Sequence, residues 1–458
     1  MRRRIAVTFL AFLLGSAVAA SAQTWRAGID SRVELMSILF RLAGNQEYRQ
    51  CRVPAYDQAI EKYFAPFRNH DAVQLAHSLA IGFDAPMKLA VRLGDVVSLS
   101  ELIPLDRPLL YGERVRDFLA GARKFVGETN FQAFLQSQQP LFAATDASLQ
   151  AFIRDQADLG WFASFFGRPS PARLTIVPGM ANGAPSYAAR FIDASGALEI
   201  YAIPGVSKVD PDGVPVFDSD WRIVMVHELA EVYADAAAGK FVAQMQAPAG
   251  RIYQAVAPAM QRQSYGNWRI MLDQSLARAV TIEYVIAHDG PEAARAVVWK
   301  ENAKSFFWMG DLVNLLETYR KDRQQYPTFE SFLPRVVEFF NDAAPTIRDV
   351  VDRQQPKVIS TSIADGASDV DPATKGIVVR FSMPMNRVGP ARSAKMSGGR
   401  FDSSGTAVTI PVTLEPQRDY AIPLRWSGGQ EFLSADGVPL PVVVLRFRTA
   451  AAAPPQKQ

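Results

Sequence analysis

The sequence predicts an α+β protein: a mostly helical region with a small antiparallel sheet, followed by a β-sandwich. Apolar residues recur at helical spacing over most of residues 23–350, and three short strand-like runs interrupt this pattern between 173 and 203. After about residue 356, strand-like runs alternate with turn residues. With 48% hydrophobic residues and a single cysteine, Cys51, the chain must be stabilised by packed cores rather than by disulfides.

The first 22 residues have the features of a secretory signal peptide. A basic stretch at 2–4 precedes an apolar run at 5–19, and Ala-Ser-Ala at 20–22 supplies a cleavage site. We therefore expect a periplasmic or secreted protein with no transmembrane segment after signal removal. The signal carries three of the 49 basic residues, and the rest balance the 46 acidic ones, so we expect no nucleic-acid partner.

Residues 23–350 are expected to form one large, mostly helical domain. Ser31 and Glu34 match a capping box before an apolar-periodic run that ends at Gly44. Further helices are predicted over about 54–67, 70–80, 113–126, 130–158, 251–288, 291–321 and 328–342. Strands separated by glycine and proline turns are predicted at 173–177, 186–192 and 197–203.

Residues 356–449 are expected to form a β-sandwich, because strand-like runs recur there at even spacing. The strand candidates are 376–381, 407–410, 419–424 and 442–448. The segment also resembles the bacterial Ig-like domain of surface-layer and secreted proteins. The matching sequences are 360–372 (STSIADGASDVDP), 379–385 (VRFSMPM) and the Asp436-Gly437 turn. Residues 450–458 are expected to be a disordered tail.

The residues with the most chemical information lie on a helix predicted over about 220–238, with caps at 218–220 and a stop at Gly239. His227 and Glu231 are one turn apart on one stripe of this helix, and Glu228 lies about 100° away. In the H-E-x-x-H pattern of zinc peptidases, two such histidines bind Zn²⁺ and the glutamate is the general base. Here Glu231 stands where the second histidine would be. Charged groups on so apolar a helix need a metal or a hydrogen-bonded cluster as partner.

The first 340 residues also resemble a poorly characterised family of bacterial secreted proteins, a domain of unknown function, whose members carry H-E-x-x-H. The resemblance is carried by 30–39 (DSRVELMSIL), 63–64 (YF), 70–73 (HDAV), 82–85 (GFDA), 227–228 (HE) and 273–279 (DQSLARA). A sheet, then the His-Glu helix, then a later helix with a third ligand is similar to the arrangement in gluzincin peptidases. By this resemblance, Gln274 stands where family members have a glutamate ligand.

The resemblance implies a zincin-like, metallopeptidase-like domain that hydrolyses amide bonds if it is active. His227, Glu231 and Gln274 would be the metal ligands and Glu228 the catalytic base, acting on a peptide or protein in the cell envelope. Because glutamine is neutral and weakly donating, the ligand set is degenerate, and Zn²⁺ is expected to be held weakly or not at all. The strand at 197–203 is expected to hold an extended peptide by β-addition.

Three alternatives stay open. Asp235, Asp273 or Glu283 would complete a harder, oxygen-rich site for Mn²⁺ or Ca²⁺. A non-catalytic envelope protein would bind a peptide or glycan in the zincin-like cleft, with no stoichiometric metal. A glycosidase would use Glu228 and Glu231 as its carboxylate pair, although such pairs normally come from separate elements.

Other candidate residues have simpler explanations. Cys51 is expected to be a small buried hydrophobic residue rather than a catalytic thiol. His77 is expected to be structural or exposed, and His288 suits the negative end of a helix dipole. His70 either lines the cleft or lies in a helix cap formed by Asn69 or Asp71.

Overall fold

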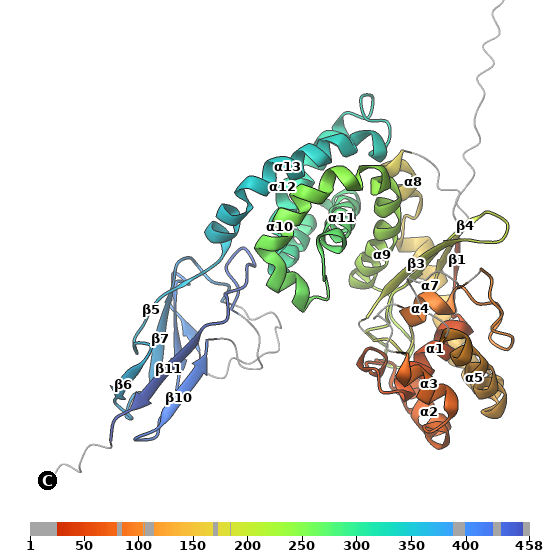
Figure 1. Ribbon diagram of the computed structural model, residues 1–458, viewed down its shortest axis with the longest axis horizontal. Coiled ribbons are helices and arrows are strands. Elements are labelled where there is room, and N and C mark those ends of the chain that lie inside the picture. The colour runs from red at the N-terminus through yellow and green to blue at the C-terminus, as the bar shows by residue number, and fades with distance from the viewer. Residues whose placement is uncertain are drawn as a thin grey trace, which may run out of the picture.

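The computed structural model describes residues 25–79, 85–103, 105, 114–167, 173–183, 185–387, 399–424 and 432–451. The predicted signal at 1–22 and residues 452–458 of the predicted tail lie outside the described residues. The protein is mixed α and β, with helices over most of the chain up to residue 354 and strands in small sheets. The helical part forms an arch, with the C-terminal strands at one end and the N-terminal helices with the first sheet at the other (Figure 1).

The N-terminal part consists of short helices packed around aromatic side chains. Phe64 is fully buried, and its ring centroid lies 4.8 Å from that of Phe134 and 5.6 Å from that of Phe125. The elements are α1 (Ser31–Leu42), η1 (Gln46–Arg49), α2 (Pro54–Phe64), η2 (Ala65–Phe67), α3 (Asp71–Ser78), α4 (Ala85–Ala90), α5 (Arg114–Glu128), α6 (Phe131–Ser137), α7 (Gln139–Gln156) and α8 (Gly160–Phe166).

The capping box predicted for α1 is wrong. Asp30 is the N-cap, and its side chain accepts a hydrogen bond from the backbone nitrogen of Arg32 at 2.9 Å. Glu34 instead points into the core, where it is fully buried and accepts a hydrogen bond from the Tyr56 hydroxyl at 2.6 Å. Burial raises the pKa of Glu34 to about 8. The carboxyl group predicted to cap the helix is thus a buried, proton-binding core residue.

The first sheet has the strand order β1-β2-β4-β3. Its strands are β1 (Trp25–Ala27), β2 (Arg173–Ile176), β3 (Tyr187–Ile192) and β4 (Leu198–Ile203). The strands predicted at 173–203 are present, and β3 and β4 pair antiparallel as expected, but the sheet is mixed, because β1 and β4 both run parallel to β2. The chain between β2 and β4 contains β3 and is long enough for the crossover that parallel pairing requires. β3 pairs antiparallel with β4 and is left at the edge of the sheet.

The second half of the helical part contains the long helices. They are α9 (Ser219–Ala238), η3 (Gly239–Phe241), α10 (Val242–Arg262), α11 (Trp268–Ala303), α12 (Met309–Lys321) and α13 (Phe329–Gln354). The single helix predicted over 251–288 is two helices, because Asn267 caps a new one through the backbone nitrogens of Arg269 and Ile270. Gly290, with φ +85°, kinks α11 where the predicted helical run ended.

The C-terminal strands form two sheets, with the orders β5-β7-β9-β8 and β10-β11-β6. Their strands are β5 (Val358–Thr361), β6 (Ala367–Val370), β7 (Gly376–Phe381), β8 (Arg400–Phe401), β9 (Ala407–Pro411), β10 (Asp419–Pro423) and β11 (Val444–Thr449). Phe381 and Val379 of one sheet share an apolar core with Leu445 and Phe447 of the other. The four strands predicted here are present, and the helical pattern ends before β5 as expected.

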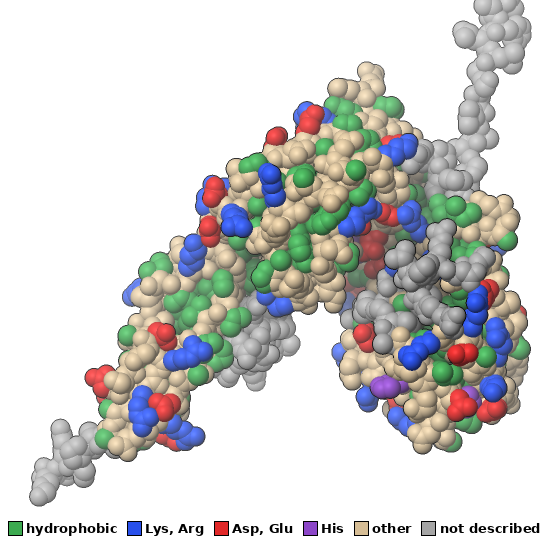
Figure 2. Space-filling view, in the orientation of Figure 1, with side chains coloured by type: hydrophobic (Ala, Val, Ile, Leu, Met, Phe, Trp, Pro, Cys, Tyr) green, Lys and Arg blue, Asp and Glu red, His purple; other side chains and the backbone are tan. Residues whose placement is uncertain are grey.

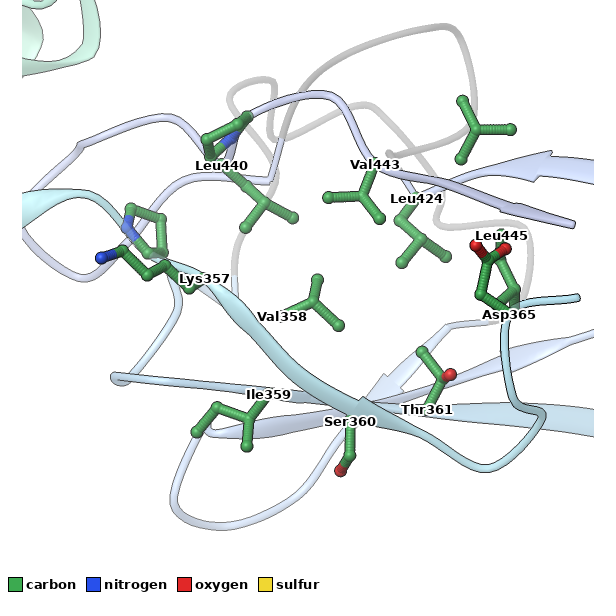
Figure 3. A pocket seen from close by; sticks show the side chains of 13 residues that line it. Lys357, Val358, Ile359, Ser360, Thr361, Asp365, Leu424, Leu440, Val443 and Leu445 are labelled. Atoms are coloured by element: carbon green, nitrogen blue, oxygen red, sulfur yellow. The ribbon is translucent and has the colours of Figure 1, made fainter. Parts of the chain in front are cut away.

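An open groove of about 450 Å³ lies between β5 and the chain that leads into β11. Val358, Val443 and Leu424 lie around it, whereas Ile359 points away (Figure 3). The groove is lined by β5, which is the edge strand of its sheet. Among the described residues, no helix is both long enough and apolar enough to cross a membrane.

Candidate functional site on helices α9 and α11

Helix α9 places the predicted chemistry on one partly exposed stripe. Asp218 caps the helix by accepting a hydrogen bond from the backbone nitrogen of Trp221 at 3.0 Å. Met225, Val226, Leu229 and Ala230 are fully buried and fix the orientation of the helix against the sheet and α11. Val224, His227, Glu231 and Asp235 share the remaining face. Figure 2 shows acidic side chains over α9 at the back of the hollow between the two halves of the helical part.

The three residues predicted as metal ligands meet at this stripe. The Nε2 atom of His227 lies 3.2 Å from Oε1 of Glu231, with the two side chains 19% and 31% exposed. Gln274, from α11, donates a hydrogen bond from its amide nitrogen to the same Glu231 oxygen at 2.5 Å. The imidazole, carboxylate and amide therefore form one hydrogen-bonded group across two helices.

Two donors hold the Gln274 amide in this orientation. Its oxygen accepts from the Tyr265 hydroxyl and from Nη2 of Arg278, each at 3.2 Å. Arg278 also donates to the Tyr265 oxygen at 2.8 Å and forms a buried ion pair with Glu301. Because both donors approach the amide oxygen, the amide nitrogen is the atom that faces Glu231.

The electrostatics of Glu231 follow from these contacts. Burial alone would raise its pKa, but the hydrogen bonds from His227 and Gln274 favour the charged form. The net effect lowers the pKa of Glu231, so the carboxylate is ionised at neutral pH. Its charge is compensated by direct hydrogen bonds and by the nearby guanidinium of Arg278.

This donor set does not fit a zinc ion. The Gln274 atom that faces Glu231 is an amide nitrogen, which has no lone pair to offer a metal, and the amide oxygen is held by Tyr265 and Arg278. A guanidinium this close also opposes a second positive charge. Across the described parts of the chain, no group of three or more His, Cys, Asp or Glu side chains is placed to hold a metal.

Glu228, the predicted general base, is on the same helix and only 7% exposed. It lies about 100° around the helix from His227, so it leaves the stripe that the other two predicted residues share. Its role as a base therefore remains a prediction.

The alternative acidic ligands are bound by arginines. Asp235 pairs with Arg190 of β3 and with Arg269 of α11, and Arg269 also bonds Asp273 at 2.8 Å. Burial raises the pKa of Asp273 to about 6. These contacts tie α9 to α11 and to the edge strand of the first sheet.

Glu283, the third alternative, is fully buried and pairs with Arg320 at 2.6 Å. Burial raises its pKa to about 7. This carboxyl group joins α11 to α12 through an ion pair with arginine.

The other singled-out residues have structural contacts. His70 is itself the N-cap of α3, accepting from the backbone nitrogen of Ala72 at 3.0 Å, so the predicted caps at Asn69 and Asp71 are wrong. The Nδ1 atom of His77 donates to the Ala43 carbonyl at 3.0 Å.

His288 donates from Nδ1 to the Tyr284 carbonyl at 2.8 Å, within the last turn before the Gly290 kink. Cys51 is partly buried, and its thiol donates to the Met180 carbonyl at 3.3 Å. Burial raises the pKa of Cys51 to about 12, so the reactive thiolate is not formed at neutral pH.

Peptide addition to the predicted strand at 197–203 is not available in this fold. That strand, β4, pairs with β2 on one side and β3 on the other. The edge strand next to β4 is β3, where the Arg190 carbonyl accepts a hydrogen bond from Arg92 at 2.9 Å. Residues two apart on a strand turn their backbone groups to the same side, so Ala188 and Ile192 face outward with Arg190.

Tyr265, Arg278 and Glu301 were missed by the sequence analysis as members of the site. Arg278 follows Gln274 by four residues, a spacing that puts both on one helix face once 268–289 is known to be helical. Tyr265 and Glu301 come from outside that turn, and nothing in their local sequence indicates the contact.

Comparison with known proteins assigns the family. Residues 76–339 match the model of the Domain of unknown function (DUF4932) family, and the chain belongs to it. No curated protein matches the sequence. A solved S-layer protein, rSbsC(31–844), is similar at 14% identity over 76% of this chain and 43% of that one, with a TM-score of 0.16. The chain thus spans less than half of that protein, and so low a TM-score gives no support for a shared fold.

Proposed function

We propose that this chain is a non-catalytic, exported envelope protein whose zincin-like domain binds an extended peptide beside α9. The non-catalytic part of the proposal rests on the orientation of the Gln274 amide. Its nitrogen donates a hydrogen bond to Glu231, whereas a metal ligand at this position would have to offer a lone pair to the ion. His227, Glu231 and Gln274 satisfy one another by hydrogen bonds, and partly buried polar groups that are satisfied in this way need no metal.

The peptide part of the proposal rests on the edge strand. β3 lies against α9, and its Arg190 side chain pairs with Asp235 on the stripe that carries His227. A peptide added to β3 would use the outward backbone groups of Ala188 and Ile192 and would replace Arg92 as the partner of the Arg190 carbonyl. Ile192 is 64% exposed and offers an apolar contact at the end of that edge.

Export and the C-terminal region complete the proposal. The basic and apolar stretches of residues 1–22 support delivery to the periplasm or beyond the cell. The two C-terminal sheets with a shared core support an Ig-like sandwich, in keeping with the sequence resemblance at 360–385.

Metal analysis of the purified mature protein tests the proposal. We expect the wild type to take up no stoichiometric Zn²⁺ and its melting temperature to be unchanged by chelator. The Glu231→His/Gln274→Glu double variant restores two imidazoles and a carboxylate, and we expect it to bind about one zinc per chain. Stoichiometric zinc binding by the wild type, equal to that of the double variant, would contradict the proposal.

A degenerate metallopeptidase is the second candidate, because His227, Glu231 and Gln274 lie together at one place, although the Gln274 amide would have to turn its oxygen toward the ion. Its ligands would be these three residues, its ion a weakly held Zn²⁺ and its base Glu228. It predicts peptide hydrolysis by the wild type that is lost in Glu228→Gln while metal uptake is retained. Absence of hydrolysis with excess zinc, in a protein that still binds it, would rule this candidate out.

A further inference from the structure

The C-terminal β region makes a specific contact with the far end of α11. The indole nitrogen of Trp299 donates to the Ala435 carbonyl at 2.8 Å, and the Asn302 amide donates to the Asp436 carbonyl at 3.2 Å. Both acceptors belong to one tight turn, closed by a hydrogen bond from the Gly437 nitrogen to the Ser434 carbonyl at 3.0 Å. Two side chains of the helix therefore bind two successive carbonyls of one turn.

Shape and burial support the same contact. Gly437 has φ +87°, and a Cβ atom there would lie 2.6 Å from the Trp299 carbonyl oxygen and 3.0 Å from its ring. The next residue, Val438, is fully buried and belongs to the core of the helical part rather than to the core between the two C-terminal sheets. The turn is thus inserted into the helical part, and glycine is the residue that permits so close an approach.

The same segment of α11 leads to the polar site. Glu301 lies between the two anchoring residues, Trp299 and Asn302, and is 6% exposed. It pairs with Arg278, which holds the oxygen of the Gln274 amide. The helix backbone between Trp299 and Asn302, the Glu301–Arg278 ion pair and the hydrogen bonds of Gln274 therefore join the docked turn to Glu231.

From these contacts we infer that the turn Ser434–Val438 is a brace. It fixes the C-terminal β region against α11 and holds the helix segment that positions Arg278 and, through it, the amide of Gln274. The C-terminal region is then a fixed part of the protein rather than a module on a free linker. This inference stands independently of whether the site binds a metal or a peptide.

Substitution of two glycines separates docking from simple backbone strain. Gly437→Val introduces a Cβ against Trp299, whereas Gly366→Val, at φ +82° in the same region, meets nothing within 4 Å. Both variants place a valine at a positive φ and share that backbone strain. They differ only in the contact with Trp299, which Gly437→Val alone disrupts. Trp299→Phe is a milder variant that keeps an aromatic ring at this position and removes the indole N–H donor.

The distance between the two parts is measured by double electron–electron resonance in a Cys51→Ser background. One spin label replaces Lys321, whose side chain is 73% exposed, and the other replaces Ile359, which is 67% exposed. We expect one narrow distance distribution for the wild type and Gly366→Val, a broad one for Gly437→Val, and an intermediate one for Trp299→Phe. A broad wild-type distribution, or no change in Gly437→Val, would overturn the docking.

The effect on the site is read from the histidine side-chain NMR signals. The chain has four histidines, and His227 alone contacts Glu231, whereas His70 and His77 lie in the N-terminal part. We expect the His227 imidazole signals to shift in Gly437→Val while those of His70 and His77 stay in place. Loss of docking without a His227 shift would refute the brace, because the turn would then hold only the C-terminal region.

Discussion

Gln274→Glu is expected to destabilise the protein by about 3 kcal/mol or more near neutral pH in the presence of chelator. In the native protein the Gln274 amide nitrogen supplies the proton between itself and Glu231, at a distance of 2.5 Å. A carboxylate would keep one oxygen on Tyr265 and Arg278 and turn the other toward Glu231. Two ionised acceptors would then face each other in a partly buried position, and such a pair requires a cation or a shared proton.

Divalent metal ions are therefore expected to restore much of the stability of Gln274→Glu, since His227 and two carboxylates form a donor set for Zn²⁺ or Mn²⁺. Thermal and denaturant unfolding with chelator or with excess metal measures both effects. The Glu231→Gln/Gln274→Glu double variant is the matched control: it reverses the direction of the hydrogen bond, should recover stability, and should not respond to metal. Full stability of Gln274→Glu in chelator would show that the amide donor is dispensable.

The unfolding free energy should fall as the pH rises from about 4.5 to 8, and Glu34 should account for much of the change. Burial raises the pKa of Glu34 from 4.5 to about 8, so within this window the folded state holds a proton that the unfolded state has released. The stabilising effect is complete below pH 4.5, decreases by about 1.4 kcal/mol per pH unit, and is lost above pH 8.

Glu34→Gln should remove the Glu34 share of this dependence and leave the smaller shares of Asp273 and Glu283, because an amide keeps an acceptor for Tyr56 and has no proton to lose. We expect the variant to exceed the wild type in stability at pH 8 and to resemble it near pH 5. Glu338→Gln, at a carboxylate whose side chain is 60% exposed, is the control and should leave the wild-type slope unchanged. Parallel stability curves for wild type and Glu34→Gln would contradict this assignment.

The sequence was sufficient to predict helix α9 and the position of His227 and Glu231 on one face of it. Asp218 is a strong local cap, and the apolar positions around His227 follow the helical period, so both the start and the inward face of the helix are encoded locally. The three strands that follow α8, and the four C-terminal strands, were likewise found from alternation and turn residues.

Features that depend on distant parts of the chain were not predicted. The parallel pairing of β2 with both β1 and β4 is decided by tertiary packing, and the short strand β1 carries too few residues to show a period. The division of the predicted helix 251–288 was missed because apolar periodicity continues through α10 and α11, while the cap at Asn267 is a single residue.

The site shows the same limit. The spacing of His227 and Glu231 predicts a shared face, but the identity of their partner is fixed by Tyr265 and Glu301, which reach Gln274 or Arg278 through the packing of α11. Local sequence indicates which side chains need a partner. It does not indicate whether the partner is a metal ion or an arginine-held amide.

The position of β1 has a consequence for how the protein acquires its structure. Trp25 pairs with Leu174, so the edge strand β1 can pair only after the intervening N-terminal helices and β2 have been synthesised. Long-range parallel pairing of this kind is slow relative to helix formation. Until β2 has been synthesised, β1 has no strand to pair with, and its backbone groups stay open to pairing with other chains.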